Sequence, residues 1–167
     1  LKIAIDCKTT YRRPRSAPDR PRPQFRYTLG SYTSFLRDGT KNIEFPYDQY
    51  SAHWVLGFLY TRADEDMSSG IVPLEKRGEI TLPYSDVEWF LQEKYKIAGT
   101  TPGSGNTTNI GSVPGRDTVE PFRLGAGPFA QLDDGEEAFK DYWAHYQPDG
   151  SGYSTLEEYL QTRGAGR

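Results

Sequence analysis

Two side chains that can do chemistry lie two residues apart near the start of the chain, Asp6 and Lys8. They fall within residues 3–11, an apolar segment typical of a strand, and successive side chains of a strand point to opposite faces. Asp6 and Lys8 therefore share one face, and Ile5 and Cys7 share the other. A carboxylate that binds a divalent metal and a lysine that faces a phosphate or an attacking water suit metal-dependent phosphodiester cleavage. By itself Asp-x-Lys is a weak motif.

The composition favours a single domain with its own core. The chain has 167 residues, of which 35% are hydrophobic and 26% charged, and we expect residues 1–167 to form one α/β domain. No apolar run approaches the ~20 residues of a membrane helix, so we expect no membrane association. The single cysteine excludes an internal disulfide and fits a reducing cytoplasm. We interpret Cys7 as a small core residue, because it lies opposite Asp6.

Charge is unevenly distributed although the net charge is only -3. A basic, proline-rich segment follows the Asp-x-Lys strand directly, and its arginines are Arg12, Arg13, Arg15, Arg20, Arg22 and Arg26. This segment, residues 12–26, could contact a phosphate backbone. It is equally compatible with a solvated loop, since its four prolines disfavour regular structure.

The elements that must position these residues follow from hydrophobic patterning. Residues 53–61 form a near-continuous apolar run and predict a central strand. We expect a mixed central β-sheet flanked by helices. The other predicted elements are a strand and helical turn within 27–41, a loop over 63–79, a strand over 87–98, a loop over 100–115, and C-terminal helices over 136–146 and 155–161.

A second unusual stretch, residues 99–115, is rich in Gly, Ser, Thr and Asn. Its glycines permit close backbone approach, and Asn106 could bond an adenine edge in DNA. It lacks the Gly-Lys-Ser/Thr sequence of a phosphate-binding P-loop. Without other support, a flexible surface loop is the favoured interpretation of this stretch.

Residues 147–158 resemble an EF-hand calcium loop, with Gly152 and Glu158 at the invariant glycine and bidentate acid positions. The first ligand position holds Gln147 instead of Asp, and there is no second hand. Because of these departures, a calcium-binding module is only the weaker alternative function. His53 and His145 have no ligand-spaced partners, and we interpret both as ordinary packed or surface histidines.

Several segments in order resemble the EcoRV family of type II restriction endonucleases, within the Pro-Asp…Asp-x-Lys nuclease superfamily. The segments are residues 2–11, 28–35, 40–43, 48–50, 52–54, 103–112 and 141–143. The resemblance implies a restriction-endonuclease-like fold and a homodimer that binds double-stranded DNA. It also implies Mg²⁺-dependent cleavage of both strands at a short palindrome, GATATC or a related site, within a restriction-modification system.

The resemblance also implies roles for individual residues. Asp6 would be a catalytic, metal-binding carboxylate, and Lys8 would orient the attacking water or stabilise the developing charge. The residues that match the recognition loop are Gly103, Gly105, Asn106 and Thr107. The residues that match positions near the DNA backbone are Thr9, Thr10, Ser34, Lys41, Arg62 and Asn109.

Two departures from the family pattern matter. The first catalytic Asp of the family would lie before residue 1, so we expect this chain to be the C-terminal part of an endonuclease and to be inactive alone. Residues 147–152 lack the arginines that the family carries near DNA, for which the segment Arg12–Arg26 would compensate. The alternative to an enzyme is a DNA-binding protein that has lost its active site.

Overall fold

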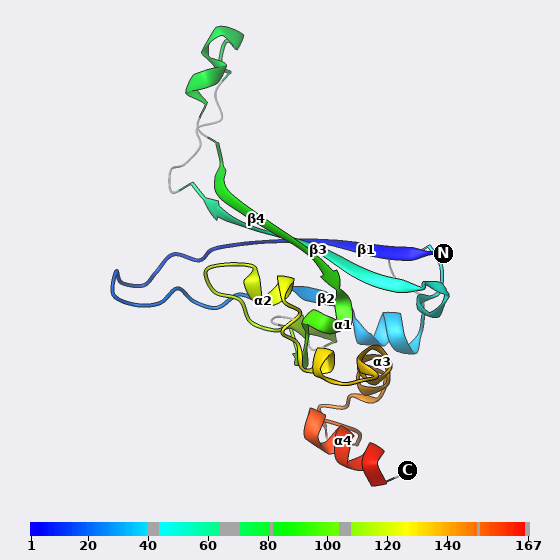
Figure 1. The fold of residues 1–167 in the computed structure, drawn as a ribbon. Helices are drawn as coiled ribbons and strands as arrows, with labels where there is room; N and C mark the ends of the chain where they lie inside the picture. Colours follow the sequence, from blue (N-terminus) through cyan, green and yellow to red (C-terminus); the bar gives the residue numbers. More distant parts are fainter. Residues whose placement is uncertain (40–43, 64–70, 81, 104–107, 150, 166–167) are drawn as a thin grey trace.

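The computed structural model describes residues 1–39, 44–63, 71–80, 82–103, 108–149 and 151–165 (Figure 1). The fold is α/β, with a mixed sheet and helices packed beside it, as the sequence predicts, and it also contains a smaller antiparallel sheet. No helix within the described residues is long and apolar enough to span a bilayer.

The mixed sheet has the strand order β1-β3-β4. Strand β1 (Ile3–Tyr11) runs parallel to β3 (Ala52–Arg62), and β4 (Tyr84–Glu93) runs antiparallel to it. The register sets Asp6 opposite Val55 and Lys8 opposite Gly57. The predicted central strand is thus confirmed, because β3 is hydrogen-bonded on both sides.

The smaller sheet has the strand order β2-β6-β5 and is antiparallel. Its strands are β2 (Thr28–Ser31), β6 (Asn109–Ser112) and β5 (Ala98–Pro102). A short π-helical turn, Thr33–Arg37, follows β2 at once, which confirms the strand and helical turn predicted there.

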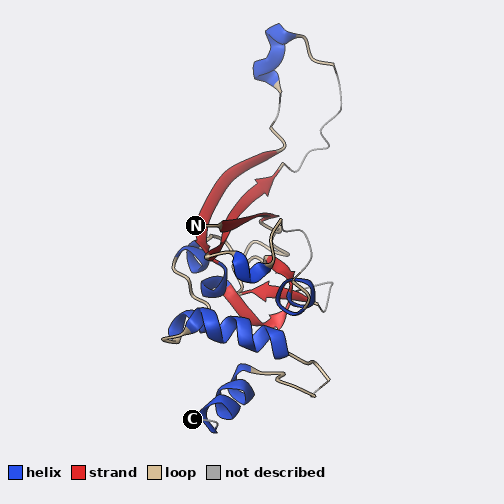
Figure 2. Ribbon diagram, turned by 90° about the vertical axis from the view of Figure 1, so that its right-hand side faces the viewer, coloured by secondary structure: helices blue, strands red, loops and turns tan. Residues whose placement is uncertain are grey.

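Helices and turns complete the domain. The α-helices are α1 (Lys94–Ile97), α2 (Glu120–Arg123), α3 (Gly135–His145) and α4 (Leu156–Ala165). The 3-10 turns are Tyr47–Gln49, Leu74–Glu79 and Pro128–Gln131. Figure 2 shows the turn Leu74–Glu79, which falls between β3 and β4 in the chain, lying away from the rest of the domain.

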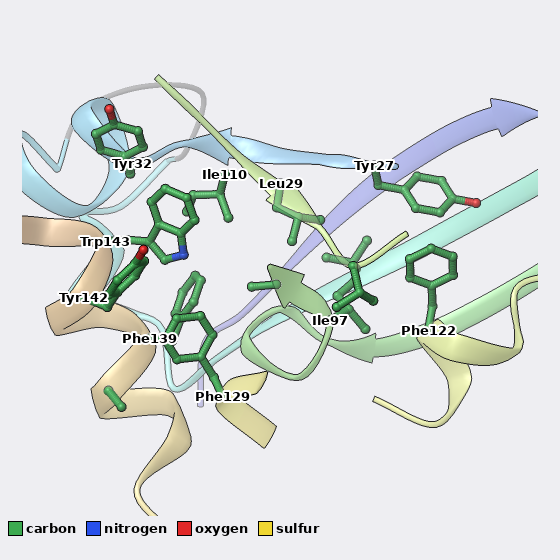
Figure 3. Packing of buried hydrophobic residues seen from close by; sticks show 14 of the residues in the cluster. Tyr27, Leu29, Tyr32, Ile97, Ile110, Phe122, Phe129, Phe139, Tyr142 and Trp143 are labelled. Carbon is green, nitrogen blue, oxygen red and sulfur yellow. The ribbon is translucent and has the colours of Figure 1, made fainter. Parts of the chain in front are cut away.

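An aromatic core holds the sheets and α3 together (Figure 3). Trp143 and Tyr142 of α3 are fully buried, as their helical spacing predicts. The Tyr142 hydroxyl donates a hydrogen bond to the Thr100 carbonyl at 2.8 Å. The rings of Tyr27, Phe90 and Phe122 pack against one another with centroids 5.0–5.4 Å apart. This core fixes the antiparallel sheet relative to the mixed sheet.

Two element predictions are wrong in part. The strand predicted over 87–98 ends at Glu93, after which Lys94–Ile97 forms a single helical turn and the chain enters β5. The loop predicted over 100–115 contains the end of β5 and all of β6. Backbone pairing with β2 and β5, which local composition does not encode, stabilises β6 as a strand.

The interpretation of Cys7 as a core residue is also wrong, because Cys7 is exposed. Side chains alternate along β1 as predicted, but the face that carries Ile5 and Cys7 is exposed to solvent. We call it the open face of β1. Ile3 and Ile5 are 48% and 58% exposed, and Trp89 of β4 is 57% exposed. Within the described residues, nothing covers this face of the mixed sheet.

The basic segment 12–26 is in part a structural element. Arg12 forms an ion pair with Glu88 and donates to the carbonyls of Asp86 and Asp117. Arg26 donates to the Ser112 carbonyl at 2.7 Å. These arginines are occupied by the chain itself, so phosphate binding by the whole segment is not supported.

Candidate active site

A cleft of about 440 Å³ lies where the two sheets meet. Asp6 and Lys8 reach it from β1, while Ser31 reaches it from the end of β2 and Asn109 from the start of β6. Ser34, in the π-helical turn, also lines the cleft. The fold therefore gathers into one hollow residues that are more than a hundred positions apart in the chain.

Asp6 and Lys8 form an ion pair in this cleft, with Lys8 Nζ 3.1 Å from Asp6 Oδ1. Their side chains are 30% and 26% exposed, so each is half-buried and still reachable from solvent. The predicted common face is confirmed, because strand alternation turns both side chains away from the open face that carries Ile5. The pairing offsets the cost of holding two charges beside an apolar strand.

The floor of the cleft is built from His53 on β3, Tyr47 and Lys94. His53 stacks on Tyr47 with ring centroids 3.5 Å apart, and its Nε2–H donates to the Tyr47 carbonyl at 3.0 Å. Burial, together with the smaller effect of the nearby Lys94 ammonium, lowers the pKa of His53 to about 4, so this imidazole is neutral at pH 7. His53 is thus a packed histidine, as interpreted from the sequence.

Lys94 is the first residue of α1 and is only 5% exposed. Burial lowers the pKa of its ammonium to about 8, which Asp6 opposes and Lys8 reinforces. Sequence reasoning missed this residue. Local sequence gave no signal for it, because a lysine beside other polar residues is normally assigned to a solvent-facing position.

The predicted DNA-contacting residues divide between the cleft and a second hollow. Ser34 and Asn109 line the cleft with the Asp6–Lys8 pair, and Gly103 donates its N–H to the Asn109 carbonyl at 2.7 Å. Thr9 and Arg62 line a separate hollow of about 700 Å³, on the side of the mixed sheet that carries the open face of β1.

The remaining predicted contacts are not all placed. Thr10 is half-buried on the same side of β1 as Asp6 but does not line the cleft. Lys41, Gly105, Asn106 and Thr107 lie outside the described residues.

The metal implied by the family resemblance can be tested against the donors of the cleft. Mg²⁺ is commonly bound by one or two carboxylates, substrate phosphate oxygens and water. Asp6 fits as one such carboxylate, because it reaches the cleft and its oxygens are partly exposed. In the part of the chain that the structure describes, no three His, Cys, Asp or Glu side chains are grouped as metal ligands. Further ligands would have to come from substrate, water or other residues.

In the EF-hand-like segment, Glu158 caps a helix. The Glu158 carboxylate accepts hydrogen bonds from the Ser154 and Thr155 backbone N–H groups, and Thr155 Oγ1 accepts one from the Glu158 N–H at 3.2 Å. This reciprocal arrangement is a capping box at the start of α4. Glu158, the proposed bidentate calcium ligand, is therefore engaged as a helix cap.

Two comparisons with known proteins give consistent results. A family model described as restriction endonuclease EcoRV matches residues 1–164. The chain is 44% identical over 165 residues to the type II restriction enzyme EcoRV of Escherichia coli. That alignment covers 95% of this chain and 62% of the relative, so the chain spans about three fifths of the length of that protein.

Proposed function

The chain belongs to the EcoRV restriction endonuclease family, and we propose that the protein carrying it is a type II restriction endonuclease. It hydrolyses phosphodiester bonds in both strands of double-stranded DNA at a short palindromic site, GATATC or a close relative. The observation that carries the proposal is the Asp6–Lys8 pair, which opens into a cleft lined by Ser34 and Asn109. A DNA-cleaving enzyme of this kind acts within a restriction-modification system.

The residues of the cleft suit the steps of such a hydrolysis. Asp6 provides a carboxylate for a divalent metal, for which we propose Mg²⁺ because the donor is a hard oxygen. A bound metal would neutralise phosphate charge and lower the pKa of a water. Lys8 lies beside Asp6 on the same face, where its ammonium can bind the scissile phosphate and stabilise the charge that develops there.

We further propose that the loop between β5 and β6 reads the DNA sequence. Gly103 and Asn109 flank this loop and are joined by a backbone hydrogen bond at 2.7 Å, which holds its two ends together. Gly105, Asn106 and Thr107, within the loop, are the proposed base-contacting residues. Thr9, Thr10, Ser34, Lys41, Arg62 and Asn109 are proposed to contact the backbone, which positions the loop without reading sequence.

A homodimer would match a palindromic target, because each copy reads one half-site. Exposed apolar residues between β3 and β4 in the chain support this proposal. Ile71, Leu74 and Leu82 are 103%, 74% and 69% exposed, and exposed apolar side chains suit contact with another protein surface. Sedimentation of the purified protein measures its oligomeric state.

The test is cleavage of a plasmid of known sequence by the protein that carries this chain. We expect Mg²⁺-dependent cuts at one palindrome and loss of cleavage by at least ~10³-fold in Asp6→Asn. Lys8→Met should also reduce cleavage while metal-free DNA binding persists. Asp133→Asn, which makes the same chemical change at an exposed carboxylate, is the matched control. Undiminished cutting by Asp6→Asn would overturn the assignment, and wild-type binding without cutting under any divalent metal would indicate a non-catalytic DNA-binding protein.

A further inference from the structure

A buried lysine faces the cleft in addition to the Asp6–Lys8 pair. Lys94 is 5% exposed, and its side chain lines the same cleft as Asp6 and Lys8 although it comes from α1, at the end of a different strand. Among the described residues, no carboxylate lies within 4.0 Å of its ammonium. A buried charge without an ionic partner is costly, so the burial of Lys94 at this cleft needs a reason.

Two aromatic rings hold the Lys94 ammonium in place. Nζ lies 5.2 Å from the centroid of the Phe35 ring and 5.5 Å from that of the Tyr47 ring, both within the range of cation–π attraction. These rings also line the cleft. Such contacts stabilise a cation and restrict its position, but they do not neutralise it.

The net charge of the cleft is positive because of Lys94. The ionisable side chains lining it are Asp6, Lys8, Tyr47, His53 and Lys94. Burial raises the pKa of Tyr47 and lowers that of His53, so both are neutral at pH 7. Asp6 and Lys8 neutralise each other as an ion pair. The remaining charge is the single positive charge of Lys94, which matches the single negative charge of a phosphodiester.

We propose that Lys94 is a substrate-binding residue whose buried ammonium holds the phosphodiester that enters the cleft beside Asp6 and Lys8. The inference rests on the proposed function and adds a residue to it. Lys8 is partly exposed and paired with Asp6, whereas Lys94 is fixed by its burial and its two rings. Lys94 therefore supplies a preorganised positive charge that requires no side-chain rearrangement when the phosphate arrives. Its pKa of about 8 leaves it mostly cationic at pH 7.

The experiment compares Lys94→Met with the wild-type protein in binding a short DNA duplex without divalent metal, at several salt concentrations. Methionine keeps most of the side-chain volume and removes the charge. We expect affinity to fall roughly tenfold or more, and the slope of log K against log salt to fall by about 1. Lys96→Met is the matched control, because Lys96 lies on the same helical turn and pairs with Glu93 outside the cleft.

The salt slope distinguishes phosphate binding from a structural role. A lysine that only supports the fold would change thermal stability and leave the slope unchanged. We expect the melting temperature of Lys94→Met to equal or exceed that of the wild type, because an uncompensated buried charge has been removed. An unchanged slope and affinity in Lys94→Met, with normal wild-type binding, overturns this inference alone. If the wild-type protein itself does not bind DNA, the proposed function fails and the inference fails with it.

Discussion

Replacing His53 by Gln should remove much of the acid sensitivity of the fold. His53 is 6% exposed and stacked on Tyr47, and burial and the Lys94 ammonium lower its pKa from 6.5 to about 4. Because His53 takes up a proton more readily in the unfolded chain than in the folded one, the stability that depends on neutral His53 is fully present above pH 6.5. It is lost as the pH falls toward 4.

The size of the effect follows from the two pKa values. With one pKa unit corresponding to about 1.36 kcal/mol, protonation linked to His53 lowers the free energy of unfolding by about 1.4 kcal/mol at pH 5.5 and about 2.6 kcal/mol at pH 4.5, relative to pH 8. The glutamine amide can donate to the Tyr47 carbonyl, as the imidazole does at 3.0 Å. Loss of ring stacking should make the variant less stable by about 1 kcal/mol at pH 8.

The assay is urea denaturation at pH 8, 5.5 and 4.5 for the wild-type protein and for His53→Gln. The wild-type protein should have the larger free energy of unfolding at pH 8, and this advantage should shrink and then reverse as the pH falls. His145→Gln makes the same change at an imidazole that is 65% exposed, and it should keep the wild-type loss of stability. Parallel curves for wild type and His53→Gln would refute the argument, and so would an NMR titration in which the His53 imidazole becomes protonated near pH 6.5.

Two further substitutions test how the scaffold is packed. Gly57→Ala places a methyl group against the Phe90 ring and should cost about 2 kcal/mol of unfolding free energy in a denaturant titration, whereas Gly78→Ala, with open space around it, should be near neutral. Arg12→Met removes the partly buried ion pair with Glu88 and should cost about 1–2 kcal/mol by the same assay. A loss below 0.5 kcal/mol in either case would contradict the packing described.

Local sequence patterns predicted what depends on local geometry. Asp6 and Lys8 share a face because strand alternation follows from the covalent backbone, and the spacing of Tyr142 and Trp143 placed them on the buried side of α3. The same alternation could not tell which face of β1 is covered. Cys7 was therefore placed in the core although it is exposed.

Long-range pairing explains most of what could not be predicted. The stretch that contains β6 has the composition of a loop, yet it forms a strand because it is hydrogen-bonded between β2 and β5. Gly111 shows how close this packing is: a Cβ at that position would lie 2.8 Å from the Thr101 carbonyl oxygen. From local sequence, Gly111 looks like a sign of flexibility. In the structure it is required because another strand approaches closely at this position.

Lys94 was missed for a related reason. Its burial depends on the helical turn that interrupts the apolar segment after Glu93 and on the rings of Phe35 and Tyr47, which come from a different part of the chain. A lysine in such a segment is normally assigned to a solvent-facing position. Only tertiary packing shows that it reaches the cleft instead.

The charges of the cleft connect these observations to the proposed chemistry. The Asp6–Lys8 pair is partly exposed, and ion pairs of that kind are weak, typically about 0–1 kcal/mol, so a metal and a phosphate can separate them without a large penalty. Once a phosphate engages Lys8 and a metal engages Asp6, Lys94 remains as the buried positive charge, because no conformational change is needed to present it. Asp6→Asn raises the net charge of the cleft from one to two. The proposed function therefore requires that this variant bind DNA at least as tightly as the wild type without metal, even though it has lost cleavage.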